Sequence, residues 1–276
     1  MALASLRAQT IDDWECVIVD DGSPCDAATV VRRFGDPRFR IHTFRTNRGR
    51  PVARQKALEM ARGDYICMLD ADDWYYPDKL RSQLQLLEQY PRAAAVGCGV
   101  AVIDDDNRIT GVRRSGGEEV QLNTGQRFRV PSLLFPTTMF RREVARDAEF
   151  DPRLQRAEDP DYLCNALAGR HYLVSPRLHY AYREIFSARA LEEALIAFRC
   201  QRITFRDQLR AAPARSALKY LENLIKTGVY RLALATGRGR WLFERRNARA
   251  TLRQRRMFRD HRQQVRSKLP SELTAP

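Results

Sequence analysis

An apolar segment that ends in a cluster of acids constrains the fold more than any other feature of this chain. Residues 65–69 (Tyr-Ile-Cys-Met-Leu) follow Gly63, and Asp70, Asp72 and Asp73 come directly after them. A helix that ends at a glycine, then a buried strand, then acids is the order in which an α/β sheet brings carboxylates to its carboxyl edge, where ligands bind. The segment therefore predicts an α/β sheet with a polar site at the end of this strand.

The spacing of these acids predicts a metal site. If Asp70 and Asp72 continue the extended backbone, their side chains point the same way, because strand side chains alternate. Two converging carboxylates repel each other unless a cation lies between them. Oxygen ligands suit Mg²⁺ or Mn²⁺, and either ion would also hold a substrate phosphate. The alternative is an acidic, solvated loop after a strand.

Strands alternate with helices along the first part of the chain. We expect strands over residues 15–19, 39–44, 65–69 and 94–103, and helices over residues 26–34, 51–62 and 78–89. This alternation predicts a doubly wound, mostly parallel sheet. Residues 113–124 are polar and contain glycine, and we expect a loop there.

Charge divides the chain near residue 187. The 276 residues are 44% hydrophobic, which is typical of a globular protein, and the formal net charge is +14. Residues 1–186 contain 27 basic and 27 acidic side chains, whereas residues 187–276 contain 21 basic and only 7 acidic ones. We therefore expect an α/β domain over residues 1–186, followed by a basic, α-helical region over residues 187–276.

The composition also argues against several classes of protein. None of the six cysteines forms a C-x-x-C pair, so no zinc or redox motif is predicted, and a reducing cytoplasm fits best. The first ten residues lack the apolar core of a signal peptide. No uninterrupted apolar stretch reaches the roughly 18 residues that a membrane span needs. We expect a cytoplasmic chain without a transmembrane helix.

Four short segments in a fixed order resemble family 2 glycosyltransferases of the GT-A fold. They are residues 9–10 with 14–23 (Trp-Glu-Cys-Val-Ile-Val-Asp-Asp-Gly-Ser), residues 47–49 with 53–54, residues 61–73 and residues 157–159 (Ala-Glu-Asp). Each motif is weak alone, and their order and spacing carry the resemblance. It covers about residues 1–186, and it implies the GT-A fold and sugar transfer from a nucleotide donor.

The resemblance implies a role for each residue around the donor. Asp21 would contact the nucleotide base, with a UDP-sugar the favoured donor, and Asp20 would shape the turn around it. Arg54 would reach the diphosphate. Asp70 would face the ribose or the donor sugar, and Asp72, with Asp70, would ligate the Mn²⁺ or Mg²⁺ ion that bridges both phosphates. The alternatives are an ordinary strand-to-helix turn at residues 20–21 and a solvated arginine at position 54.

A second acidic pair would supply the catalytic base by the same resemblance. Glu158 and Asp159 match the Glu-Asp pair of the family, and Asp159 is the expected base that takes the proton of the acceptor hydroxyl. Neighbouring acids, Asp161 among them, raise the proton affinity of such a group. Direct attack on the anomeric carbon would invert it. The second interpretation, compatible with the first, is an acid cluster at a helix N-terminus with Pro160 in the first turn.

Three further segments bear on substrate binding. Residues 180–183 (Tyr-Ala-Tyr-Arg) do not match the Q-x-x-R-W motif of processive members, which favours transfer of a single sugar. Residues 136–142 resemble the segment that walls the acceptor side, with an ordinary strand leading into a helix as the alternative. Residues 74–76 (Trp-Tyr-Tyr) are candidates either for stacking on a sugar or for the core.

The family's first strand is missing from this sequence. In a doubly wound sheet that strand lies between those that contain Val17 and Met68, so we expect an unfilled position at the centre of the sheet. One hypothesis is that the true start lies upstream of Met1. The other is that the chain is a damaged enzyme.

The basic region over residues 187–276 leaves three interpretations open. Arg-rich amphipathic helices can bind anionic membrane surfaces or the phosphates of nucleic acid, and we favour a membrane surface or no specific partner over nucleic acid. They are also often merely solvated. A membrane surface would suit a lipid-linked acceptor and a peripheral location at the inner face of the membrane.

Taken together, these features predict an inverting, metal-dependent, non-processive glycosyltransferase. It would transfer one sugar to a glycan or lipid-linked acceptor in bacterial envelope polysaccharide or glycan assembly. The alternative is a non-catalytic remnant or binding module of the same fold. A nucleotidyltransferase is a third hypothesis, but the Gly-rich phosphate loop that it requires is not seen.

Overall fold

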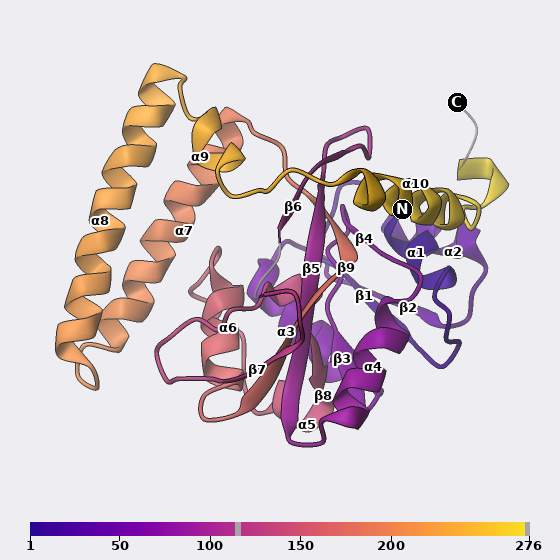
Figure 1. The fold of residues 1–276 in the computed structure, drawn as a ribbon, viewed down its shortest axis with the longest axis horizontal. Helices are drawn as coiled ribbons and strands as arrows, with labels where there is room; N and C mark the ends of the chain where they lie inside the picture. Colours follow the sequence, from indigo (N-terminus) through magenta and orange to yellow (C-terminus); the bar gives the residue numbers. More distant parts are fainter. Residues whose placement is uncertain (114–116, 274–276) are drawn as a thin grey trace.

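The first ninety residues alternate between helices and strands, as their sequence predicts. The computed structural model describes residues 1–113 and 117–273 (Figure 1). The elements of this first part are α1 (Ala2–Arg7), β1 (Cys16–Asp20), α2 (Ala27–Phe34), β2 (Phe39–Thr43), α3 (Arg50–Met60), β3 (Tyr65–Cys67), β4 (Trp74–Tyr75) and α4 (Lys79–Gln89).

Local sequence signals explain where these helices begin and end. The Asp26 side chain accepts a hydrogen bond from the Thr29 N–H at 3.0 Å and so caps the N-terminus of α2. The same helix ends at Gly35, whose φ of 58° is easily reached only without a Cβ. Helix α3 begins after Gly49 and has Pro51 in its first turn, where the missing N–H costs nothing.

The second part of the α/β body contains two long strands, of which the sequence predicted β5 but not β9. Its elements are β5 (Ala93–Ile103), β6 (Ile109–Arg113), β7 (Gln121–Thr124), the short 3₁₀ helix η1 (Phe135–Thr137), β8 (Met139–Arg141), α5 (Arg142–Arg146), α6 (Glu158–Ala166) and β9 (His171–Arg183). The loop expected over residues 113–124 is wrong at both ends, because Arg113 ends β6 and residues 121–124 form β7, which pairs with β9. Residues 114–116 of that loop lie outside the described residues.

These strands form two sheets, and together with the helices they confirm the α/β fold class. In the smaller sheet, β1 and β2 are parallel. The larger sheet has the order β3-β8-β5-β9-β4, with β6 on β5 and β7 on β9. It is mixed: β5 and β9 are parallel, whereas β8 is antiparallel to both β3 and β5.

The position between β1 and β3 is not filled by a strand of the described residues. The two strands belong to different sheets, although both line one cavity of about 1820 Å³. Helices α1, α2 and α3 also contribute to its walls. This arrangement agrees with the expectation of an unfilled position between the strands of Val17 and Met68. The cavity continues to the acidic turn at residues 70–73.

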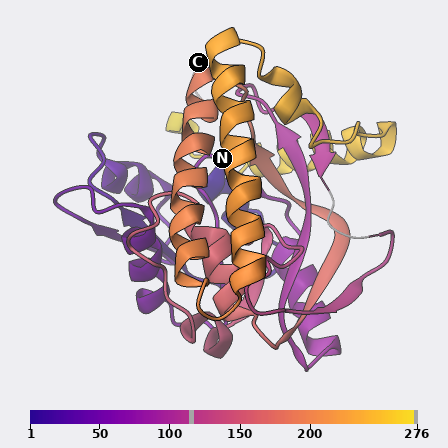
Figure 2. The ribbon, with the colours of Figure 1, turned by 90° about the vertical axis from the view of Figure 1, so that its left-hand side faces the viewer.

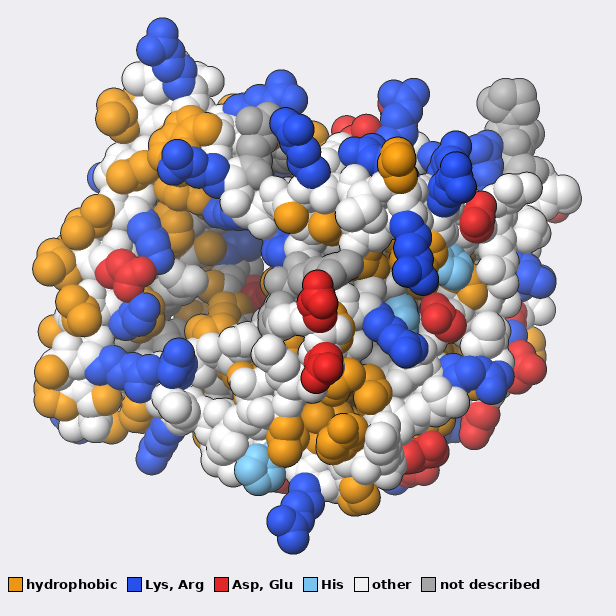
Figure 3. All heavy atoms as spheres, viewed as in Figure 1, with side chains coloured by type: hydrophobic (Ala, Val, Ile, Leu, Met, Phe, Trp, Pro, Cys, Tyr) orange, Lys and Arg blue, Asp and Glu red, His pale blue; other side chains and the backbone are white. Residues whose placement is uncertain are grey.

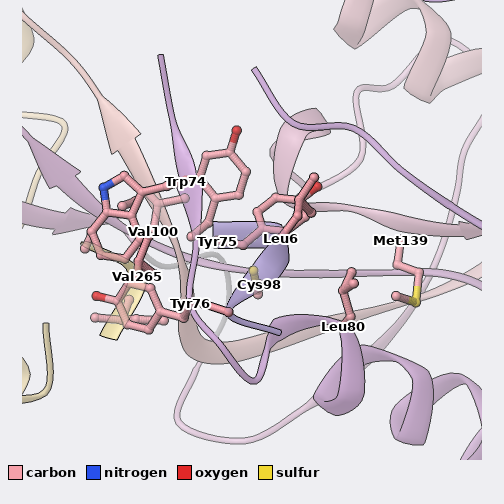
Figure 4. Close-up of a cluster of buried hydrophobic side chains, with 14 of the residues drawn as sticks. Leu6, Trp74, Tyr75, Tyr76, Leu80, Cys98, Val100, Met139 and Val265 are labelled. Atoms are coloured by element: carbon pink, nitrogen blue, oxygen red, sulfur yellow. The ribbon is translucent and has the colours of Figure 1, made fainter. Parts of the chain in front are cut away.

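Three consecutive aromatic residues are among the largest side chains of the core, and one of them, Tyr75, lines this cavity. Trp74, Tyr75 and Tyr76 are at most 1% exposed, and the Trp74 and Tyr76 rings stack with centroids 5.5 Å apart (Figure 4). Phe258, from the far end of the chain, packs against Trp74 with ring centroids 5.3 Å apart. The three aromatic residues therefore belong to the core, and the interpretation of them as a sugar platform is wrong.

The basic region is helical, as expected, and its parts differ in where they pack. Helices α7 (Ala188–Asp207) and α8 (Pro213–Thr236) lie side by side as a hairpin on one flank of the molecule (Figures 1 and 2). After the short α9 (Arg240–Glu244), α10 (Leu252–Arg266) returns to the body and buries Phe258 and Val265 in its core. The division into domains at residue 187 stays a prediction. In the described residues, no helix combines the length and apolarity needed to cross a bilayer.

Candidate active site

The acidic segment after β3 forms a tight turn. Strand β3 ends at Cys67, and the Asp73 N–H donates to the Asp70 carbonyl at 3.1 Å, which closes a turn over residues 70–73. Asp70 and Asp72 therefore do not continue the extended backbone of β3, and the prediction that their side chains point the same way as in a strand does not apply. Asp72 is exposed, and the Asp70 side chain is 36% exposed. Both carboxylates line the large cavity.

Asp73 fastens this turn to the end of β9. Its side chain is buried and accepts hydrogen bonds from the Tyr180 hydroxyl at 2.8 Å and from the Arg183 N–H at 2.7 Å. Burial, reinforced by the charges of Asp72 and Asp70, raises the pKa of Asp73 to about 8. Asp73 does not cap the next helix, because α4 begins only at Lys79.

Arg183 and Tyr180 position the turn, and the sequence did not assign them this role. The Arg183 guanidinium donates to the Asp72 carbonyl at 3.0 Å and to the Asn107 side chain at 2.8 Å. The Tyr180 hydroxyl accepts a weak bond from the Asp70 N–H at 3.4 Å. Both residues lie in the last four positions of β9, a strand that the sequence did not predict, so no local signal marked them.

Arg54 connects the acidic turn to the second acidic pair. From α3, its guanidinium donates to Asp70 Oδ1 at 3.0 Å and to Glu158 Oε1 at 2.8 Å. It lies over the Phe135 ring, 5.1 Å from the centroid, and its side chain is only 15% exposed. Burial alone would lower the pKa of Arg54, but the charges of Asp70, Glu158 and Asp159 outweigh burial and raise it. The alternative of a solvated arginine is therefore wrong.

Glu158 and Asp159 begin helix α6. The preceding residue, Ala157, has a φ of 62°, a strained conformation for a residue with a Cβ. This turn places Glu158 at 2% exposure against Arg54. Burial raises the pKa of Asp159 to about 6, while Arg54 opposes the shift and Glu158 adds to it. The acid cluster at a helix N-terminus is confirmed, and it is compatible with a base at Asp159.

Asp20 and Asp21 organise the loops at the end of β1. Asp20 accepts from the Ser23 N–H at 3.0 Å. The two carboxylate oxygens of Asp21 accept from the N–H groups of Arg48 and Gly49, at 2.7 and 2.9 Å, and so fix the loop that precedes α3. Asp21 also lines the large cavity. Its contact with a nucleotide base stays a prediction.

The predicted site residues divide into two adjoining groups. Asp21, Arg54, Asp70 and Asp72 line the cavity, and the acidic pair of α6 is reached through Arg54. The expected acceptor wall over residues 136–142 stays a prediction, and of these residues Met139 lines the cavity. They run through η1 and β8 into α5 and are mostly buried, which supports the alternative of a strand leading into a helix.

The acidic turn fits a divalent cation in its donor chemistry. Asp70 and Asp72 offer hard carboxylate oxygens beside a cavity, where Mg²⁺ and Mn²⁺ are usually held with substrate phosphates completing the shell. Arg54 engages one oxygen of Asp70, and the Asp72 side chain faces solvent. Within residues 1–113 and 117–273, no group of three or more His, Cys, Asp or Glu side chains forms a metal cage. An ion here would therefore depend on ligands from the substrate.

The sequence model of glycosyl transferase family 2 matches residues 1–148. The chain belongs to this family. The resemblance seen in the motifs is thereby confirmed, and its fold is that of the family.

Curated relatives agree with this family assignment. The succinoglycan biosynthesis protein ExoO of Rhizobium meliloti is 30% identical over 198 residues, which are 66% of this chain and 55% of that protein. The amylovoran biosynthesis glycosyltransferase AmsB of Erwinia amylovora is 30% identical over 181 residues, 59% of this chain and 56% of that protein. The matches span just over half the length of these relatives.

Solved structures show the same fold. The S. aureus TarS 1–349 structure in complex with UDP-GlcNAc superposes with a TM-score of 0.62 at 17% identity, and the match covers 99% of this chain and 78% of that one. The likeness therefore extends over the helical region as well as the α/β body.

Proposed function

We propose that this chain is an inverting, metal-dependent glycosyltransferase that moves one sugar from a nucleotide-diphosphate donor to an acceptor hydroxyl. The observation that carries the proposal is the double ion pair of Arg54. One guanidinium joins Asp70, in the turn where a donor would bind, to Glu158, the neighbour of the proposed base. The family membership and the TarS structure with UDP-GlcNAc support a nucleotide-sugar donor.

The donor would lie in the large cavity. The nucleotide base of the donor would lie near Asp21 at the end of β1. The diphosphate would lie near the start of α3, where free N–H groups and the helix dipole favour anions. Asp70 would face the ribose or the sugar. A bound diphosphate would also compete with Asp70 and Glu158 for Arg54, so the guanidinium is placed to exchange a carboxylate for a phosphate.

Asp159 would act as the base. Its carboxylate takes the proton of the acceptor hydroxyl as that oxygen forms a bond to the anomeric carbon and the bond from this carbon to the phosphate oxygen breaks. The electron pair of the broken bond leaves with the nucleoside diphosphate. Burial raises the pKa of Asp159 to about 6, so the group is a better base than an ordinary aspartate and is still ionised at neutral pH.

Asp72 and Asp70 would hold Mn²⁺ or Mg²⁺, which when bound would offset the negative charge that develops on the leaving diphosphate. This assignment rests on the exposed carboxylates at the rim of the cavity. Arg183 and Tyr180 would keep the turn in place through its backbone and through Asp73.

The acceptor would be a glycan or a lipid-linked sugar in envelope polysaccharide assembly, and one sugar would be added per encounter. The names of the relatives ExoO and AmsB support this polysaccharide context. We also propose a cytoplasmic location, with peripheral contact to the inner face of the membrane through residues 187–276.

Donor turnover tests the proposal directly. The purified chain is incubated with UDP-sugars and Mn²⁺, and released UDP is measured with and without chelator. We expect turnover that is lost with chelator and falls at least about a hundredfold in Asp72→Asn. Asp106→Asn, an exposed aspartate outside the cavity, is the matched control. Metal-dependent release that survives Asp72→Asn would contradict the site.

Calorimetric titration with UDP separates an enzyme from a binding module. If UDP binds in the presence of Mn²⁺ but no sugar is released from any UDP-sugar, the non-catalytic alternative is favoured. If neither occurs, the cavity is not a donor site.

A further inference from the structure

Helix α8 presents its apolar side to solvent. Five residues spaced three or four apart, and so on one side of the helix, are all well exposed, and we name them the apolar stripe. They are Leu218 (66% exposed), Leu221 (56%), Ile225 (62%), Val229 (40%) and Leu232 (66%). Large exposed apolar patches on a folded protein usually mark an interaction site.

The opposite side of α8, which packs on α7, carries polar side chains, with the Tyr230 ring packed on Phe198 at a centroid distance of 5.0 Å. Asn223 and Thr227 are 3% and 7% exposed and accept hydrogen bonds from Arg202 of α7, at 2.7 and 3.0 Å. Asn223 also donates to Gln201 at 3.0 Å. Hydrogen bonds between the two helices therefore fix which side of α8 faces the protein, and the apolar stripe faces away from it.

Positive charge borders the apolar stripe. Residues 213–240 contain six basic side chains and one acidic one. Lys219 and Lys226 lie along one side of the stripe and share Glu222, at 2.9 and 2.7 Å, whereas Arg231 lies on the other side. Exposed Trp241 follows just beyond the helix end. Figure 3 shows this mixture of apolar and basic side chains over the hairpin at the left edge of the molecule.

We propose that the apolar stripe of α8 docks on an anionic lipid bilayer, with the helix lying in the plane of the interface. An apolar strip bordered by Lys and Arg, with a tryptophan at its end, is the pattern of helices that insert shallowly among lipid headgroups. The net positive charge selects an anionic surface over a neutral one, because basic residues near such a surface each add to the attraction. It also disfavours a second copy of the same helix, whose like charges would meet.

Binding of the bilayer by α8 is independent of the proposed chemistry. Its use, to bring the enzyme to a lipid-linked acceptor, rests on the proposed function. Helix α7 stands between the stripe and the acidic pair. Arg156, just before α6, forms an ion pair with Glu193 of α7 at 3.0 Å, and Arg153 pairs with Asp207 at 2.7 Å. The hairpin is thus tied to the segment that carries Asp159. A docked hairpin would hold the proposed base at a fixed height above the bilayer.

Vesicle flotation tests the docking. The full chain is mixed with phosphatidylcholine vesicles that contain or lack phosphatidylglycerol. We expect flotation with the anionic vesicles only, weakened by high salt. Leu221→Glu/Ile225→Glu is expected to reduce binding at least about tenfold, and Arg215→Gln/Arg231→Gln by roughly tenfold. Leu252→Glu, at an exposed leucine of α10 outside the stripe, should float like the wild type.

Two outcomes would overturn the docking. One is flotation that is equal for wild type and Leu221→Glu/Ile225→Glu. The other is absence of flotation together with a dimer that the same double variant converts to a monomer in analytical ultracentrifugation, which would assign the stripe to a second copy. Release of UDP in solution should be unchanged in the stripe variants, so failure of docking and failure of the proposed chemistry give different results.

Discussion

The α/β body and the α7–α8 hairpin each contain an arginine that bridges two elements, but the two arginines bind different kinds of group. In the body, Arg54 holds two carboxylates and lies over the buried ring of Phe135. In the hairpin, Arg202 holds a neutral amide and a hydroxyl, while apolar side chains point to solvent. The first network concentrates charge where chemistry is expected. The second orients a helix so that its apolar side stays free.

Removal of Arg54 should have the largest effect, because it leaves charge uncompensated. Arg54→Ala strands the Glu158 carboxylate, which is 2% exposed, and we expect stability to fall by about 3 kcal/mol or more. Activity should fall to background, since both acidic groups lose their common partner. Urea unfolding and UDP release measure the two effects. Lys56→Ala, a partly exposed position on the same helix, is the control.

Arg54→Lys sharpens this test. A lysine keeps the charge but not the planar fork that reaches two carboxylates at once, so it should recover part of the stability and little of the activity. Full activity in the lysine variant would show that the bridge between the two acidic groups is not required.

The sequence predicted the local elements of the body well and the long-range partners poorly. The caps at Asp26 and Gly35 fix α2 within a few residues, and such signals are readable in the chain itself. The pairing of Arg54 with Glu158 could not be predicted from local signals, because 104 positions separate the two residues. Strand β9 was missed for a related reason: its thirteen residues include His171, Ser175 and Pro176, which interrupt the apolar pattern.

The hairpin shows the same limit from the other side. The sequence identified the region over residues 187–276 as helical and basic. It did not show which side of α8 would be buried. Hydrophobic periodicity predicts that the leucines face the protein, whereas Asn223 and Thr227 do.

Replacement of Asp159 should have the second-largest effect, and it should lower turnover without lowering stability. Asp159→Asn should lower turnover by roughly 10²- to 10⁴-fold, the range for a general base. In the wild type the base must be ionised, and its pKa is raised to about 6. The rate should therefore fall about tenfold per unit as the pH drops below this value. The profile of kcat/KM against pH measures this fall. A profile that stays flat as the pH crosses about 6 would exclude Asp159 as the base.

Asp73 gives a smaller effect that appears in stability. Its pKa rises from the ordinary 3.8 to about 8 in the folded chain, so the folded state holds this proton more tightly than the unfolded state. The stabilisation by protonated Asp73 is complete below pH 3.8, and it is lost as the pH rises from there toward about 8. Asp73→Asn cannot titrate and should flatten the dependence of Tm on pH across this window. Asp106→Asn should keep the wild-type slope, and an unchanged slope in Asp73→Asn would refute the shift.

Replacement of Arg202 should have the smallest effect, and it completes the comparison between the two regions. The hydrogen bonds of Arg202 go to the neutral side chains of Asn223 and Thr227, so Arg202→Leu strands no opposite charge there. It leaves the buried Asn223 amide one hydrogen bond short, and we expect the free energy of unfolding of the hairpin to fall by about 1–2 kcal/mol. Hydrogen exchange should rise in α7 and α8 and stay constant in β5, while UDP release in solution is unchanged. Arg199→Leu, an exposed position on the same helix, should leave exchange as it is. If Arg202→Leu instead abolishes turnover in solution, the hairpin is part of the catalytic unit and not only its attachment to a surface.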